Sequence, residues 1–299
     1  MQKWGTRKGF TIVELLIVVV VIAILAAITI VAYNGIQNRA KESAVQSSAS
    51  QVGKKIASHF YTNNDTYPIQ ANFSAVTGVS NSADLTYDYL VTADSKSYCA
   101  SAANSNVTIP AYASTPTSGG AVKGRCVMNM EPNPSSETTV INSAGGGGAT
   151  RTISSAQKFS GANSTKFVWV SANSGLQSTT ITVTPSTTYT VSLYVYAESG
   201  TLPVFMIAAA DYGTNSQPLS GTAATGSWQR LSQTYTTNST QTTMRTWTTV
   251  SSASTFYVDA IMITPLSSGL PAYADGSTNN WVWNGTPNNS TSFGPSIVQ

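Results

Sequence analysis

The sequence has 299 residues and few charges, with 15 Lys and Arg against 12 Asp and Glu and a formal net charge of +3. Charged residues make up 9% of the chain, well below the roughly 25% usual for a soluble domain, and the weak positive balance argues against nucleic-acid binding. A single His and 2 Cys exclude a Cys/His zinc cluster and argue against a Ser-His-Asp hydrolase. The chain is long and apolar enough for a substantial core, and its Ser/Thr-rich composition indicates a secreted, β-rich surface protein.

An apolar segment of membrane-spanning length follows a short basic stretch. Residues 1–9 contain Lys3, Arg7 and Lys8 and no acidic residue. Residues 10–33 are almost entirely apolar, and as a helix they would extend about 36 Å, enough to cross a hydrocarbon core of about 30 Å. The preceding positive charge predicts a cytoplasmic N-terminus and export of the remainder. The segment is too long for an ordinary secretory signal, so a plain signal anchor is the simplest alternative.

One acidic residue, Glu14, interrupts this apolar segment. A carboxylate within hydrocarbon costs about 2.5–3.5 kcal/mol on insertion scales, so it needs a partner. Glu14 lies one helical turn after Phe10, where the basic stretch ends. Cleavage between Gly9 and Phe10 would create a cationic α-amino group, and that group on a neighbouring subunit could neutralise Glu14. The alternative is a carboxylate that reaches to the nearby membrane interface.

The start of the apolar segment resembles the prepilin N-terminus of type IV pilins and pseudopilins. The residues that resemble it are Lys8-Gly9-Phe10-Thr11-Ile12-Val13-Glu14-Leu15-Leu16. The resemblance implies a leader at residues 1–9, cleavage after Gly9 by a prepilin peptidase, methylation of the Phe10 amine, and a role for Glu14 in subunit registration. It also implies assembly with other pilin subunits on an inner-membrane platform, from the cytoplasmic membrane to the cell surface. Members often carry a helix-kinking Pro here, and this sequence has none.

The helix is expected to span residues 10–62, because apolar residues recur at near-helical spacing up to Phe60 and no Pro occurs before Pro68. His59, the single histidine, lies near its end, where a satisfied surface role is expected rather than metal ligation. Residues 63–126 then resemble a small pilin head, in which Leu85, Tyr87, Tyr89 and Tyr98 should line one face of a short antiparallel sheet.

The two cysteines, Cys99 and Cys126, are expected to pair in an exported chain. Closing a loop of this size contributes roughly 3.5 kcal/mol through chain entropy. The alternative is two buried free thiols. The amino-acid composition changes after Cys126, which indicates that a second module begins there.

Short strand-like runs alternate with turns from about residue 150 to residue 265, which predicts a β-sandwich. The Gly run at residues 145–148 is expected to be a loop. Four segments, 129–137, 183–195, 226–231 and 255–260, resemble jelly-roll carbohydrate-binding modules. The expected fold class is therefore α+β. A long pilin helix and a small β head precede a jelly-roll domain at 127–265 and a C-terminal extension at 266–299.

Members of this module family often hold a structural Ca²⁺ between an acidic residue of the opening segment and one on a late strand. Glu137 and Asp259 are the matching positions. Ca²⁺ takes six to eight oxygen ligands, so backbone carbonyls and hydroxyls would have to supplement the two carboxylates. No other cofactor is expected.

Sugar binding requires exposed aromatic faces beside hydrogen-bonding side chains. On the strand at residues 189–196, alternation places Tyr194 and Tyr196 on the face opposite the apolar residues. Arg245 and Trp247 share one face of another strand. Each of these aromatic residues could instead pack in the core.

The sequence thus predicts a structural subunit of a type IV pilus-like filament, as a minor or tip pilin that displays an adhesive, glycan-binding sandwich. The alternatives are a pseudopilin of a secretion or DNA-uptake system, and a major pilin with a non-binding spacer domain. A tethered glycosidase is disfavoured because the distal module holds few carboxylates. They are Glu131, Glu137, Glu198, Asp211, Asp259 and Asp275.

Overall fold

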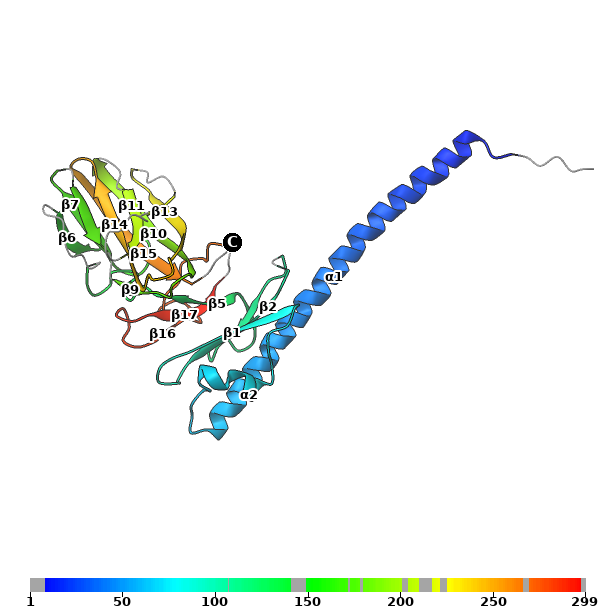
Figure 1. The fold of residues 1–299 in the computed structure, drawn as a ribbon, viewed down its shortest axis with the longest axis horizontal. Helices are drawn as coiled ribbons and strands as arrows, with labels where there is room; N and C mark the ends of the chain where they lie inside the picture. Colours follow the sequence, from blue (N-terminus) through cyan, green and yellow to red (C-terminus); the bar gives the residue numbers. More distant parts are fainter. Residues whose placement is uncertain are drawn as a thin grey trace, which may run out of the picture. The chain divides into compact units, whose positions relative to one another are not determined.

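The computed structural model describes residues 9–106, 108–140, 149–171, 173–177, 180–200, 204–209, 217–220, 225–265 and 269–296. The expected leader up to Lys8, the Gly run at 145–148 and Asp211 lie outside these residues. The chain divides into two compact units, Met1–Ala44 and Val45–Gln299. The predicted α+β class is confirmed (Figure 1).

The elements of the N-terminal part and head are α1 (Ile12–Thr62), η1 (Gln70–Asn72), α2 (Phe73–Thr77), β1 (Leu85–Val91), β2 (Tyr98–Asn104), β3 (Tyr112–Ser114), β4 (Val122–Lys123) and β5 (Arg125–Asn129). Those of the sandwich are β6 (Ala149–Ser154), β7 (Ser164–Trp169), β8 (Asn173–Gln177), β9 (Ile181–Thr182), β10 (Thr188–Gly200), β11 (Val204–Ala209), β12 (Gln217–Pro218), β13 (Trp228–Thr236), β14 (Thr243–Val250) and β15 (Ser254–Thr264). Two further strands follow, β16 (Val282–Trp283) and β17 (Ser292–Ser296).

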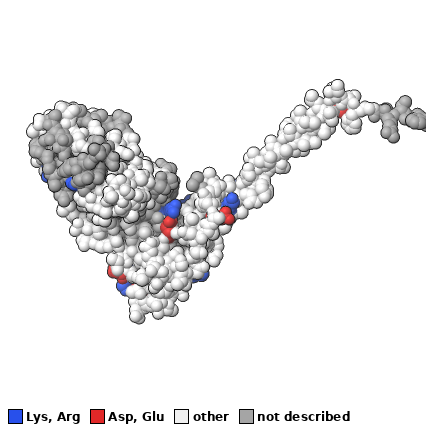
Figure 2. Space-filling model, viewed as in Figure 1, with Lys and Arg blue, Asp and Glu red and all other residues white. Residues whose placement is uncertain are grey.

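The helix α1 is continuous over 51 residues, close to the expected bounds. Its first part is apolar on every side, and its apolar side chains are exposed, as at Ile12 (85%) and Val31 (73%). Among the described residues it is the one helix long and apolar enough to cross a membrane. The helix runs through Gly35 without a break. Figure 2 shows almost no charge along this part of α1.

The head forms where the last turns of α1 become amphipathic. Val45, Ala49, Val52 and Ile56 are buried at near-helical spacing and pack on the antiparallel sheet β1-β2-β3-β4. The predicted aromatic face is confirmed, because its four members all belong to the two clusters that contain these helix residues. They are Leu85, Tyr87, Tyr89 and Tyr98.

The sandwich consists of two antiparallel sheets with a common core. One has the strand order β13-β10-β15-β7-β6, and the other has the order β12-β11-β14-β8 with β9 beside β14. The alternation predicted for β10 is confirmed, because its apolar residues are almost fully buried in the core between the sheets. They are Tyr189, Val191, Leu193 and Val195. Sequence periodicity did not reveal β6 or β12, and it missed all of β8 except Gln177.

The C-terminal segment adds strands to the end of the head. β17 lies between β16 and β5 in a three-stranded sheet, and it pairs antiparallel with β5 from Ser292 opposite Asn129 to Ser296 opposite Arg125. Residues 269–296 therefore bring the chain back to the strand by which it left the head. We call them the return segment.

Candidate assembly and binding sites

The first turn of α1 forms a reciprocal cap around Glu14. Glu14 Oε2 accepts hydrogen bonds from the Thr11 backbone N–H at 2.9 Å and from Thr11 Oγ1 at 2.8 Å, and the Glu14 N–H donates to Thr11 Oγ1 at 3.2 Å. This cap directs the carboxylate toward the start of the helix. Phe10 is 83% exposed and Gly9 is exposed, so the expected cleavage point is accessible.

The predicted disulfide is confirmed. Cys99 on β2 is bonded to Cys126 on β5, with a Cα–Cα distance of 5.8 Å. Both are buried, with exposed fractions of 0% and 6%. The bridge thus joins the middle of the head sheet to the strand that leads to the sandwich.

The four residues predicted to contact glycans lie on two different sheets. Tyr194 and Tyr196 are on β10, whereas Arg245 and Trp247 are on β14. Each pair points away from the common core, since the intervening residues of both strands are buried. A single sugar residue cannot contact both pairs, so they represent two separate candidate surfaces.

On the β10 face, another aromatic ring covers Tyr194. Phe159 stacks on Tyr194 with ring centroids 3.5 Å apart, and the Arg230 guanidinium lies 5.6 Å from the Tyr194 centroid. Tyr196 lies beside Trp228, with centroids 5.7 Å apart. Phe159 is 42% exposed and is the residue that sequence reasoning missed. The signal available was an aromatic residue in a polar loop before a strand.

On the β14 face, Arg245 and Trp247 are half-buried neighbours. In the strand register Ala208 lies opposite Arg245 and Met206 lies opposite Trp247. The indole N–H of Trp247 is buried and has no hydrogen-bond acceptor in the described part of the chain. Buried indole N–H groups usually find a partner, so an unpaired donor here is unusual.

The two predicted metal ligands lie under one loop. Asp259 is fully buried, and its Oδ2 accepts the backbone N–H groups of Phe159 at 2.8 Å and Ser160 at 3.0 Å. Its Oδ1 accepts the N–H of Ala260 at 2.7 Å. Burial raises the pKa of Asp259 to about 7 against the lowering effect of these hydrogen bonds, and the charge of Glu137 raises this pKa further.

Glu137 holds the same loop from its other end. Its Oε1 accepts the N–H of Ala162 at 2.9 Å and that of Asn163 at 3.3 Å. The Glu137 carboxylate lies against Gly161 and fills the space that a Cβ atom on residue 161 would need. The φ of +67° at Gly161 also favours glycine. The charge of Glu137 disfavours ionisation of Asp259, and carboxylate oxygens are ligands that a hard cation prefers. The two carboxylates would supply part of the ligand set, and the remaining oxygens would have to come from the backbone.

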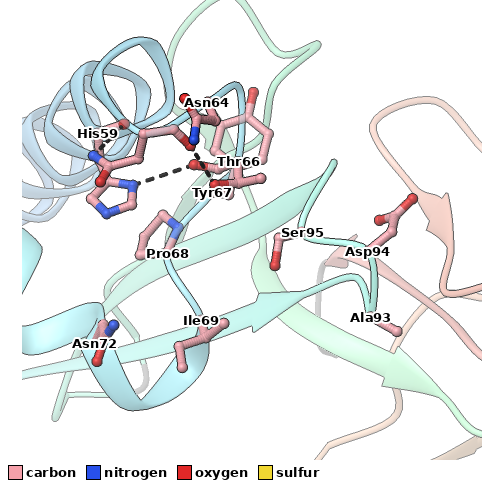
Figure 3. A pocket seen from close by; sticks show the side chains of 11 residues that line it. His59, Asn64, Thr66, Tyr67, Pro68, Ile69, Asn72, Ala93, Asp94 and Ser95 are labelled. Carbon is pink, nitrogen blue, oxygen red and sulfur yellow. Dashed lines mark hydrogen bonds between the residues drawn. The ribbon is translucent and has the colours of Figure 1, made fainter.

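A pocket of about 480 Å³ lies in the head, between the chain after α1 and the β1–β2 turn (Figure 3). His59 Nδ1 lies 3.3 Å from the carbonyl oxygen of Thr66, so the single histidine has a local partner. The described residues contain no group of three or more His, Cys, Asp or Glu that could hold a metal ion. The walls are mainly uncharged. They comprise His59, Asn63, Asn64, Thr66, Tyr67, Pro68, Ile69, Asn72, Ala93, Asp94 and Ser95.

Comparison with known proteins decides the identity of the N-terminal half. The family described as "Prokaryotic N-terminal methylation motif" matches residues 4–30. The "Type IV wide pilus major component PilA4" of Thermus thermophilus is 33% identical over 125 residues, which are 42% of this chain and 94% of that protein. The chain belongs to the type IV pilin family. The resemblance seen in the N-terminal residues is thereby confirmed.

The sandwich of this pilin has a different relationship. The family described as "Carbohydrate binding domain" matches residues 142–255. The CBM22-1 xylan-binding domain of Xyn10C from Paenibacillus barcinonensis is similar at 13% identity and a TM-score of 0.36, over 48% of this chain and 97% of that one. A family 22 module of Clostridium thermocellum Xyn10B is similar at 17% identity and a TM-score of 0.35, over 45% and 92%. Similarity at this level says nothing about what the pilin binds.

Proposed function

We propose that this pilin is a minor or tip subunit of a type IV pilus-like surface filament and displays its sandwich as a glycan-binding adhesive domain. The supporting observation is the union, in one chain, of an exposed apolar helix with a prepilin start and a domain of a carbohydrate-binding family. Apart from Glu14, the first part of the helix offers an uncharged surface for packing with other subunits. The sandwich lies at the other end of the sequence and is charge-poor, as a contact surface for neutral sugars would be.

The β14 face supports glycan binding best. An indole plane provides a stacking surface for a sugar ring, and the adjoining guanidinium of Arg245 provides donors in a fixed plane. Tyr194 is a weaker candidate for glycan contact, because Phe159 already covers one face of the Tyr194 ring. Tyr196 remains a candidate contact on the β10 face.

Processing and location follow from the prepilin start. We infer cleavage after Gly9 by a prepilin peptidase, methylation at Phe10, and membrane residence with the N-terminus inside. Assembly by an inner-membrane platform then moves the subunit to the cell surface. The proposed role is structural and adhesive rather than enzymatic. The alternative role is that of a pseudopilin in a secretion or DNA-uptake system.

A major pilin with a spacer domain is the second candidate function. The observation in its favour is the printed name of the relative, a major component of a wide pilus. Immunogold labelling of sheared filaments separates the two roles. Label confined to filament ends supports the tip subunit, regular label along the shaft supports the major pilin, and absence from filaments would contradict both.

Glycan binding is tested with full-length pilin in detergent on a glycan array. Trp247→Ala should abolish selective binding, whereas Val170→Ala, which changes an exposed apolar side chain elsewhere, should not. Tyr196→Ala reports on the β10 face. If wild-type pilin binds no glycan, the adhesive role fails and the spacer function stands.

We also propose that Glu137 and Asp259 contribute to a structural Ca²⁺ site. A cation would offset the repulsion between the two carboxylates and fix the loop at residues 159–163. Adding Ca²⁺ to chelator-treated pilin should raise the melting temperature, and Asp259→Asn should remove that increase. An identical response in Asp259→Asn would contradict the site.

A further inference from the structure

The sandwich is connected to the head by two chain crossings rather than by one linker. The chain leaves the head after Asn129, at the end of β5, and the return segment ends in β17, which pairs with β5. The sandwich is therefore inserted between two strands that are neighbours in one sheet. This differs from the serial order of head, sandwich and extension that the sequence suggested.

The two crossings meet at the side chain of Asn129, which is fully buried. Its Nδ2 donates to Ile261 O at 2.9 Å and to Ala274 O at 3.4 Å, and its Oδ1 accepts the N–H of Ile263 at 3.1 Å. The next residue, Met130, donates its N–H to Ile263 O at 2.7 Å. One amide thus bonds β5 to β15 of the sandwich and to the return segment.

The return segment also covers the disulfide with an apolar side chain. Phe293 on β17 is 1% exposed and belongs to the same buried cluster as Cys99, Cys126 and Ala113. These residues come from β17, β2, β5 and β3. Removal of β17 would therefore expose the bridge and uncover the strand that leads to the sandwich.

A tryptophan holds the return segment against the joint. Trp281 is 8% exposed and donates its indole N–H to Pro295 O at 2.9 Å. Gly294 lies flat against the indole, because a Cβ there would come within 2.5 Å of Trp281 Cγ. The same cluster includes residues of the head, the sandwich and the return segment. They are Val127, Met262 and Ala274.

We propose that the return segment and the Cys99–Cys126 bridge form a two-stage mechanical anchor for the sandwich. Tension on the sandwich first loads the hydrogen bonds that pair β5 with β17 of the return segment and the Arg125–Asp88 pair that joins β5 to β1. If these bonds break, Cys126 stops the unravelling, because it lies three residues before the exit of the chain at Asn129 and is covalently tied to Cys99. The anchor operates whether or not the sandwich binds a glycan.

Single-molecule pulling on full-length pilin in detergent tests this anchor. One handle is attached at the N-terminus and one at Ser171→Cys, an exposed position in the sandwich where the new thiol is free because the two native cysteines are bonded. In wild-type pilin the sandwich should unfold before the head opens. A head that opens first would overturn the proposal.

Two deletions separate the contribution of the return segment. In the Cys99→Ser/Cys126→Ser background, a chain that ends at Thr291 lacks β17, whereas a chain that ends at Ser296 keeps it and serves as the control. Deletion of β17 should shift head opening to lower force, and the control should not. Equal opening forces in the two chains would overturn the first stage.

Hydrogen exchange and one conservative variant cover the case in which deletion unfolds the head. Gly294→Ala keeps the full length of β17 but presses a methyl group on Trp281. The Gly294→Ala variant should increase hydrogen exchange at the β5 amides, while the β10 amides remain protected. Unchanged protection of the β5 amides would overturn the proposal that the return segment holds β5 in place.

The second stage has its own readout. With the bridge intact, tension can extract residues 127–129 but not the stretch between the cysteines, which are 27 positions apart and about 90 Å apart when that stretch is extended. In a chain that ends at Thr291 and keeps both cysteines, reduction should release that length when the head opens, at a force below the one that unfolds the sandwich. Release of this length only at forces that unfold the sandwich would overturn the proposal that the Cys99–Cys126 bridge limits unravelling.

Discussion

Arg125 and Asp88 form a two-point ion pair between β5 and β1. Arg125 Nε lies 2.6 Å from Asp88 Oδ2, and Arg125 Nη2 lies 2.9 Å from Asp88 Oδ1. The hydroxyl of Ser101 on β2 donates to the same Oδ2 at 2.9 Å. The hydrogen bonds to Asp88 raise the pKa of the Arg125 guanidinium. The strand that leads to the sandwich is thus bonded to β1 as well as to β17.

Asp88→Ala should destabilise the pilin by about 1–2 kcal/mol. The two-point geometry strengthens the pair, but the side chains are 38% and 27% exposed, so solvent reduces its contribution. Thermal or denaturant unfolding of the full chain measures the change. The matched control is Glu198→Ala, which removes the surface pair with Lys166 and a long hydrogen bond from the Tyr257 hydroxyl (3.3 Å), and it should cost less than about 1 kcal/mol. Equal effects of the two variants would contradict a special role for Asp88.

Asn129→Ala should cost about 2–4 kcal/mol, because it leaves buried backbone groups of Ile261 and Ile263 without a side-chain partner. The loss should appear as faster hydrogen exchange at the joint before the sandwich core is affected. Asn238→Ala, in an exposed turn, is the control for removal of an Asn amide. Wild-type exchange at β5 in Asn129→Ala would rule out this role.

Sequence reasoning was most successful where local signals suffice. The apolar run with its basic start, the position of Glu14 and the alternation along β10 each depend on neighbouring residues. The return segment was missed because β16 has 2 residues, and β17 has 5 that include Gly294 and Pro295, which disfavour strands. Its pairing with β5 is long-range and has no periodic signal.

The candidate binding residues show the same limit. Alternation placed Tyr194 and Tyr196 correctly on the outer face of their strand. It could not show that Phe159, from a loop, stacks on Tyr194, nor that Arg245 and Trp247 belong to the opposite sheet. Loop placement and sheet assignment depend on tertiary packing.

Glu14→Gln should abolish incorporation into filaments while leaving membrane insertion and cleavage intact. The amide can keep a hydrogen bond with Thr11, so the cap is retained and only the charge is lost. The measurement compares sheared filaments with the membrane fraction, and N-terminal sequencing confirms processing. Thr11→Val disrupts the cap instead, and it should permit assembly. Normal filaments from Glu14→Gln would show that charge is not required.

Asp259 should make the chelator-treated pilin less stable as the pH rises. Its folded pKa of about 7 lies above the ordinary value of 3.8, so the folded state binds the proton more tightly than the unfolded state. Stability contributed by the protonated form is present below about pH 4 and declines between about pH 4 and pH 7. Melting temperatures at pH 5 and pH 8 measure this decline. Asp259→Asn should flatten it, and an unchanged slope would assign the effect to another group.

The return segment also sets an order of completion. In a chain synthesised from its N-terminus, β1 to β5 come first, then the sandwich, and β17 last. The head therefore stays open on the side of β5 until β17 has been made and has paired with it. A chain that is cut short, or whose sandwich does not fold far enough to return its end, exposes the apolar surface around Cys99 and Cys126. Pairing of β17 with β5 therefore occurs only after the whole sandwich has been made.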